Sequence, residues 1–133
     1  MKIKLFALLA VNIGLLQGSK PALAHHAFAA EFDRSKAVEL KGTVTQVEWV
    51  NPHAWVRLDV KDETGAIANW ACELGSPNLL TRNGWRRDTL KPGDAIIING
   101  SAAKSGAHVA NARTVRLANG QRVFNAGSSG GDQ

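Results

Sequence analysis

Cysteine and long apolar runs are both scarce in this chain of 133 residues, and each shortage excludes a class of protein. Cys72 is the only cysteine, so an internal disulfide and a zinc finger with paired cysteines are excluded. The apolar stretch from Leu5 to Leu16 is shorter than the roughly 20 residues that a membrane-spanning helix needs, and no later segment is long and apolar enough. The sequence therefore predicts a protein without a membrane span.

Well-known catalytic signatures are missing as well. The chain has neither the His-Glu-x-x-His helix of metalloproteases nor a phosphate-binding Gly-x-x-x-x-Gly-Lys-Ser/Thr loop. With 44% hydrophobic and 20% charged residues, the composition is that of one ordinary globular domain. We therefore expect a single domain and assign no catalytic residues.

The first 24 residues have the pattern of a secretory signal. Lys2 and Lys4 precede the apolar stretch, and alanines lie at the third and the last position before a cleavage site after Ala24. We expect export to the periplasm. Removal of the signal takes away three of the basic residues, so the formal charge falls from +5 to +2. This weak excess, together with export, argues against a nucleic acid as the partner.

Alternation of apolar and polar residues predicts an all-β domain with little helix. The five expected strands cover residues 38–49, 53–60, 67–74, 95–100 and 108–117, and a short run at 121–124 follows the Asn119-Gly120 turn. A short helix is expected between the third and fourth strands, with Ser76-Pro77 at its start and Asn83-Gly84 at its end.

The first strand changes its apolar face near Thr45, which requires a bulge or a kink and lets one strand serve two sheets; Gly42 or the Thr45-Gln46 step could supply it. This order of elements favours an OB-fold-like, five-stranded Greek-key barrel; a two-sheet sandwich is the alternative. The expected parts are a signal peptide (1–24), an N-terminal arm (25–36), the barrel domain (37–124) and a flexible Gly/Ser-rich tail (125–133).

The four histidines suggest a metal site. Cleavage after Ala24 would leave His25 and His26 beside a free α-amine, and these nitrogen donors suit copper(II). His53 lies in the loop between the first two strands, on the side of an OB-fold that binds ligands. We therefore predict a metal site formed by His25, His26 and His53, with His108 as a further ligand-binding residue. The alternative is that the histidines are exposed by chance and that His53 caps a turn.

Four tryptophans are many for a domain of this size. Trp49 and Trp55 flank the Asn51-Pro52-His53 turn, so they are expected, with Asn51, to line a ligand pocket; packing on the barrel end is the alternative. Trp70 is expected in the core with Cys72, and Trp85 is expected to close the bottom of the barrel.

Two further groups of residues have a simpler expected role. Phe28 and Phe32, four residues apart, could share a helical face or anchor the arm in a groove of the barrel. A basic cluster surrounds the end of the expected helix and is interpreted as a solvated face; its members are Arg82, Arg86, Arg87 and Lys91.

The chain also resembles a family of small exported bacterial proteins of uncharacterised function. The resemblance rests on Ala24-His25-His26 after the signal, a block of Phe28, Glu31, Phe32 and Asp33, and the Asn51-Pro52-His53 turn. Further matching positions are Glu48-Trp49, Trp70, Glu73, Gly75-Ser76-Pro77, Asn83-Gly84-Trp85, Leu90, Gly93-Asp94 and Ala110-Asn111-Ala112-Arg113. The resemblance spans the mature chain and implies a periplasmic β-barrel, without implying an activity. His108 is not part of the pattern.

Three functional hypotheses follow. The first is a periplasmic binding module that holds copper or another transition metal, or a small ligand, through the histidines. The second is a cell-envelope module that binds a protein or a saccharide and has no metal site. The third is an enzyme with an N-terminal histidine copper centre, for which the sequence shows no further oxidant-handling motif.

Overall fold

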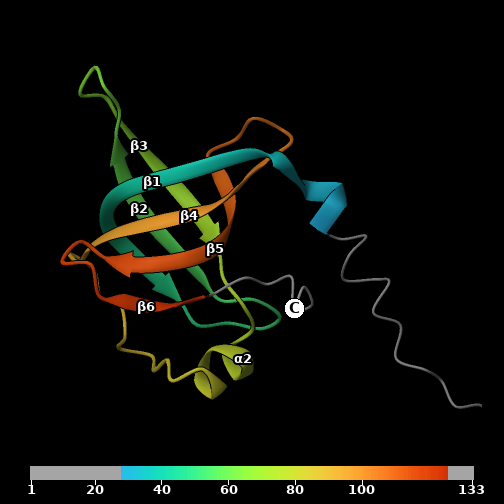
Figure 1. The fold of residues 1–133 in the computed structure, drawn as a ribbon, viewed down its shortest axis with the longest axis vertical. Coiled ribbons are helices and arrows are strands. Elements are labelled where there is room, and N and C mark those ends of the chain that lie inside the picture. The colour runs from blue at the N-terminus through green and yellow to red at the C-terminus, as the bar shows by residue number, and fades with distance from the viewer. Residues whose placement is uncertain (1–27, 126–133) are drawn as a thin grey trace, which may run out of the picture.

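The computed structural model describes residues 28–125, and this part of the chain is mostly β-strand (Figure 1). The six strands are β1 (Phe32–Glu48), β2 (Trp55–Lys61), β3 (Ile67–Glu73), β4 (Ala95–Ala103), β5 (Val109–Leu117) and β6 (Arg122–Asn125). A short helix, α2 (Pro77–Arg82), lies between β3 and β4 at one end of the sheet. The five strands expected from the sequence are all present, and the run after Asn119-Gly120 adds the short β6.

The long strand β1 pairs with both β2 and β4, and it does so by bending at one residue. Its pairing with β2 shifts register between Val44 and Gln46, so Thr45 is the bulged residue. Val44 before the bulge is buried, and Val47 after it packs against the core. The change of face that the sequence predicted near Thr45 is therefore confirmed, because an extra residue restores the apolar side of a strand to the core.

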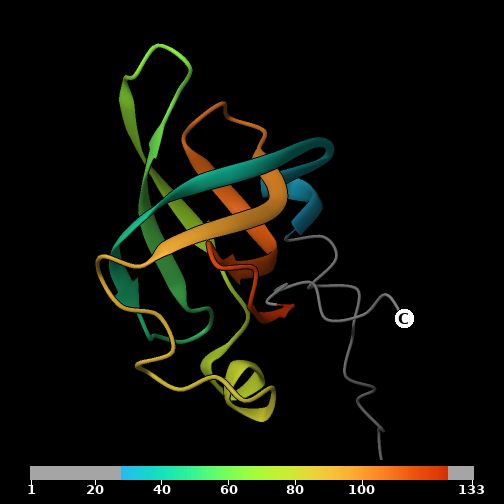
Figure 2. The same cartoon turned by 60° about the vertical axis from the view of Figure 1, so that its left-hand side comes forward.

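The strands are joined in the order β3-β2-β1-β4-β5-β6, and a parallel pairing of β3 with β5 adds a further link. Each of the strands from β1 to β4 thereby has two hydrogen-bonded neighbours, and β5 has three, namely β3, β4 and β6. The β3–β5 link is short and joins Ala71, Cys72 and Glu73 to Val109, Ala110 and Asn111. Figure 2 shows the strands wrapped around a common interior. Residues far apart in sequence are thus brought side by side.

The core fills this interior. Its fully buried side chains come from the five strands β1 to β5, from α2 and from the segment between β3 and α2: Val44, Val56, Leu58, Cys72, Leu74, Leu80, Ile96, Ile98 and Val115. Cys72 is free and buried, as expected. Trp85 is 2% exposed and belongs to the core, whereas Trp70 is partly buried against its edge.

Helix α2 begins and ends where the sequence predicts. The Ser76 hydroxyl accepts a hydrogen bond from the Leu79 amide, and Pro77 occupies the first turn. Asn83 caps the other end, and Gly84 follows with a φ of +87°, which glycine adopts without strain. No helix within residues 28–125 is long and apolar enough to cross a membrane.

The start of the described chain differs from the expected arm. Residues 28–31 are helical, and β1 begins at Phe32, before the barrel boundary placed at residue 37. Phe32 is paired with Ala103 of β4 and is 3% exposed. Burial of its side chain therefore accounts for the extension of β1 back to residue 32. The rings of Phe28 and Phe32 lie 5.5 Å apart, but Phe28 is in the helical turn and Phe32 in β1, so they do not share a helical face. The expected signal peptide and nearly all of the expected tail lie outside the described residues.

Candidate functional site

A close contact between a histidine and a glutamate lies at the corner between β1 and β2. Nδ1 of His53 lies 2.6 Å from Oε1 of Glu73, the last residue of β3. The loop is held there by two backbone hydrogen bonds of Ala54: its amide donates to the Gly75 carbonyl, and its carbonyl accepts from the Leu74 amide. The Glu73 side chain is 7% exposed, whereas that of His53 is 38% exposed. The carboxylate is therefore enclosed and the imidazole reaches the surface.

The geometry of this pair decides which nitrogen of His53 faces outward. A carboxylate only accepts hydrogen bonds, so the proton of the ring is held on Nδ1 beside Glu73. When the ring is neutral, Nε2 then carries the free lone pair. Metal-binding histidines are commonly oriented by a carboxylate in this way. His53 is therefore prepared to bind a cation or to accept a hydrogen bond through Nε2.

Glu73 belongs to a row of buried polar residues. The register pairs Ser101 of β4 with Asn111 of β5, and Asn111 with Glu73 of β3. Their exposed fractions are 3%, 4% and 6%, and they lie beside core residues that point the other way, such as Cys72 and Ala110. We call Ser101, Asn111 and Glu73 the polar row. It gives this side of the sheet a polar strip that ends at His53.

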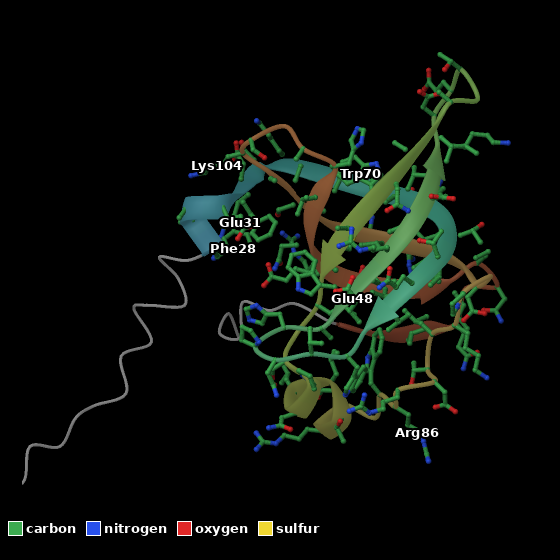
Figure 3. All side chains as sticks on the ribbon, turned by 180° about the vertical axis from the view of Figure 1, so that it is seen from behind. Phe28, Glu31, Glu48, Trp70, Arg86 and Lys104 are labelled. Atoms are coloured by element: carbon green, nitrogen blue, oxygen red, sulfur yellow. The ribbon has the colours of Figure 1, made fainter. Side chains whose placement is uncertain are left out.

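The start of the described chain lies near the other end of this row. The Lys104 amide donates to the Glu31 carbonyl at 2.9 Å, and its Nζ donates to the Ala29 carbonyl. Figure 3 shows Phe28, Glu31 and Lys104 together at this edge of the sheet. A shallow hollow there is lined by Ala30, Glu31, Ala103, Lys104, Ser105 and Val109. The residues that follow the two N-terminal histidines are thus tied to β4 and β5.

The two tryptophans expected to share a pocket occupy different surroundings. Trp55 is paired with Glu73 on β3, and its neighbours Val56 and Leu58 alternate into the core. By the alternation of a strand, Trp55 lies on the outer face with the polar row. Trp49 instead packs against the core and lines a second hollow beside α2. Of the two, Trp55 is the one near the His53–Glu73 pair.

The remaining predicted ligand residues are Asn51 and His108. Asn51 is exposed, and a cis peptide bond joins it to Pro52. The ring of His108 lies 5.0 Å from that of Trp70, and its carbonyl accepts from the Ala71 amide. His108 is therefore held by a tryptophan at the edge of the core.

The predicted metal site reaches beyond the part of the chain that the structure describes. His25 and His26 lie outside residues 28–125, and within these residues no three His, Cys, Asp or Glu side chains are grouped closely enough to hold a metal ion. His53 with Glu73 is a pair, so a metal site here needs donors from elsewhere.

The role of Glu73 and its neighbours was missed in the sequence. A signal was present, because Trp70 and Cys72 alternate onto the apolar face and leave Glu73 opposite, at the strand end. Asn111 stands between two alanines, which indicates a crowded position. The burial of Ser101 had no such signal, since it depends on which strands become neighbours.

Comparison with known proteins gives a family without an activity. Residues 13–112, about three quarters of the chain, match the model of a family of unknown function, DUF6152. Searches of curated proteins and of solved structures found no match. The matched residues include the Asn-Pro-His turn and the polar row, and the resemblance to an uncharacterised family is thereby confirmed. The chain belongs to the DUF6152 family.

Proposed function

We propose that this protein is an exported binding module with an OB-fold-like barrel, and that it binds copper(II) through His25, His26 and His53. The observation that carries the proposal is the His53–Glu73 pair, in which an enclosed carboxylate orients an exposed imidazole. A surface histidine without a ligand role has no need of a buried carboxylate, whose burial is costly unless it is paired. Binding of a cation at Nε2 accounts for an enclosed carboxylate that orients an exposed imidazole.

Three considerations support the N-terminal histidines as the other donors. Cleavage after Ala24 would supply an α-amine and two imidazoles, and copper(II) favours such nitrogen ligands. Glu31 lies beside Val109, which precedes Asn111 by two residues, about 7 Å along the strand. Asn111 is in turn the register partner of Glu73. His26 is two residues from Phe28, so chain connectivity keeps it within about 7 Å of the start of the described chain.

The OB-fold part of the proposal is supported by the topology. A bulged first strand shared by β2 and β4 and a parallel β3–β5 pairing are features of a five-stranded barrel of this kind. In such a barrel the loop between the first two strands, which here carries His53, flanks the ligand-binding face.

The test is a titration of the processed protein with copper(II), followed by calorimetry and electron paramagnetic resonance. We expect one tight site per chain, and His53→Ala should weaken it by about 10-fold to 100-fold, as should Glu73→Gln through loss of orientation. His108→Ala is the matched control, because it removes a histidine whose ring rests on Trp70, and it should leave the affinity unchanged.

Equal affinities of the wild type and of a variant with His25, His26 and His53 all replaced by alanine would refute copper binding. The remaining possibility would then be the envelope-interaction module without a metal. Mass spectrometry of the periplasmic protein tests the start of the mature chain, which should be His25.

A further inference from the structure

A second hollow lies at the α2 end of the molecule, apart from the polar row. Trp49, which follows β1, forms one wall, and Thr81 and Gly84 to Arg87 form the other; the lining residues are Trp49, Thr81, Gly84, Trp85, Arg86 and Arg87. Its volume is about 490 Å³, within the range of small-molecule sites. The hollow joins the loop after β1 to the end of α2, and Figure 1 shows these segments next to each other.

The wall of this hollow contains a buried donor. Trp85 is 2% exposed, and its Nε1 has no hydrogen-bond partner among the residues that the structure describes. Buried indole N–H groups nearly always have a partner, because leaving one unpaired costs free energy. Nε1 is itself enclosed by the surrounding residues, so Trp85 contributes a buried ring to the wall of the hollow and no accessible donor.

The rim of the hollow is basic. Arg86 and Arg87 are exposed, and Arg86 projects away from the body of the protein (Figure 3). The nearest carboxylate to Arg86 is that of Asp88, at 4.0 Å, the limit of an ion pair, and both side chains are well solvated. The two guanidinium groups are thus available to hold an anionic group, which they bind with paired hydrogen bonds.

The other wall offers an aromatic surface and a hydroxyl. Trp49 is half-buried, so part of its indole faces the hollow. Sugar rings bind against such amphipathic aromatic surfaces. The Thr81 hydroxyl donates to the Pro77 carbonyl at 2.8 Å and keeps lone pairs that accept from a sugar hydroxyl.

We propose that this hollow binds an acidic carbohydrate, with a sugar ring against Trp49 and its carboxylate on Arg86 and Arg87. The aromatic wall, the Thr81 hydroxyl and the basic rim together match a ligand that carries a ring, hydroxyl groups and a negative charge. A neutral sugar would leave the arginines without a partner, and a small inorganic anion would leave the tryptophans without one.

The test uses trigalacturonate, with maltotriose as the neutral sugar and citrate as an anion without a ring. Binding is measured by calorimetry and by the change in tryptophan fluorescence at low salt. We expect trigalacturonate to bind at least 10-fold more tightly than either control. Equal binding of citrate would show a simple anion site, and equal binding of maltotriose would show that the arginines play no part; either result overturns the proposal.

Matched variants locate the site. Arg86→Gln with Arg87→Gln should weaken trigalacturonate binding by at least 10-fold, whereas Arg113→Gln, an exposed arginine on β5, should not. Trp85→Phe keeps a buried ring and removes only an enclosed Nε1, so it should leave trigalacturonate binding unchanged. Unchanged affinity in the arginine variant, with its circular dichroism intact, contradicts the proposal. His53→Ala should bind the sugar normally, so the outcome does not depend on copper.

Discussion

His53 and Glu73 depend on each other, because each side chain is the partner of the other. Glu73 is enclosed at the end of β3, and its carboxylate has to be compensated there. His53 supplies one compensating group from a loop, on the other side of β2 in sequence. Because removal of one partner leaves the other polar group buried, the two residues should be coupled in stability as well as in ligand binding.

A double-mutant cycle measures this coupling. We expect His53→Ala to destabilise the metal-free protein by about 1–3 kcal/mol, since it leaves the Glu73 carboxylate short of a partner. With Glu73→Gln already in place, His53→Ala should cost clearly less, giving a coupling free energy within about 0.5–3 kcal/mol. Urea unfolding at pH 7 provides the four free energies. Strictly additive effects would mean that the pair has no energetic role in the fold.

For single residues, the sequence pointed to His53 as a candidate ligand residue but did not show that Glu73 is its partner. The Asn51-Pro52-His53 turn is visible because proline and histidine stand out in a short loop between two apolar runs. Glu73 looks like any carboxylate near the end of a strand, where charged side chains are usually solvated. Only the folded chain shows that it is buried and that an imidazole lies 2.6 Å away.

At the scale of the elements, the sequence was most informative where local chemistry decides the structure. A bulge or kink at Gly42 or at the Thr45-Gln46 step was predicted because the strand changes its apolar phase there, and the structure has the bulge at Thr45. The cap at Ser76 was predicted because its hydroxyl and Pro77 are typical of a helix start. The early start of β1 was missed, since it depends on the burial of Phe32 opposite Ala103.

The close approach of β4 and β5 requires a residue without a side chain at one position of β4, and no local sequence pattern shows this requirement. Gly100 lies at the register shift between these strands, and a Cβ there would overlap the carbonyl oxygen of Asn111. The neighbouring atoms are backbone, so they cannot rotate away as a side chain would. Glycine at this position therefore allows the close approach that places Asn111 in the polar row.

Gly100→Ala should for this reason be destabilising. We expect a loss of about 1–3 kcal/mol or more, the cost of overpacking against a rigid neighbour, measured by thermal or urea unfolding. Ala95→Ser, which adds one atom to an exposed residue of the same strand, is the control and should change the stability by less than about 0.5 kcal/mol. A Gly100→Ala protein as stable as this control would show that β4 and β5 can separate without cost.

For the whole molecule, the β3–β5 pairing is the feature that joins the two ends of the sheet. It connects Glu73 with Asn111 and encloses Cys72 and Ala110 beneath them. The sequence predicts the strands and their order along the chain, because these follow from alternation and turns. The parallel link between strands so distant in sequence has no local signal, so the neighbours of each site residue could not be read in advance. The polar row exists only because of this link.

The reactivity of the Cys72 thiol measures whether the buried interior stays closed. It is fully buried, and burial raises the pKa of its thiol from 9.0 to about 12. The thiol is therefore neutral in the folded protein at physiological pH, and alkylating reagents, which require the thiolate, should react with it only when the protein unfolds. Native labelling should be slow and should accelerate in step with unfolding by urea.

The same raised pKa predicts alkaline destabilisation. A folded pKa above the unfolded one stabilises the protein fully below pH 9, and this contribution is lost as the pH rises from 9 to about 12. At pH 10.5 the wild type should lose about 2 kcal/mol relative to pH 8 beyond any loss shown by Cys72→Val, which cannot ionise. The chain has no tyrosine, so no phenol titrates in this range to obscure the comparison. If the two proteins lose stability equally, the thiol ionises without opening the core, and the interior around β3 and β5 is accessible to water.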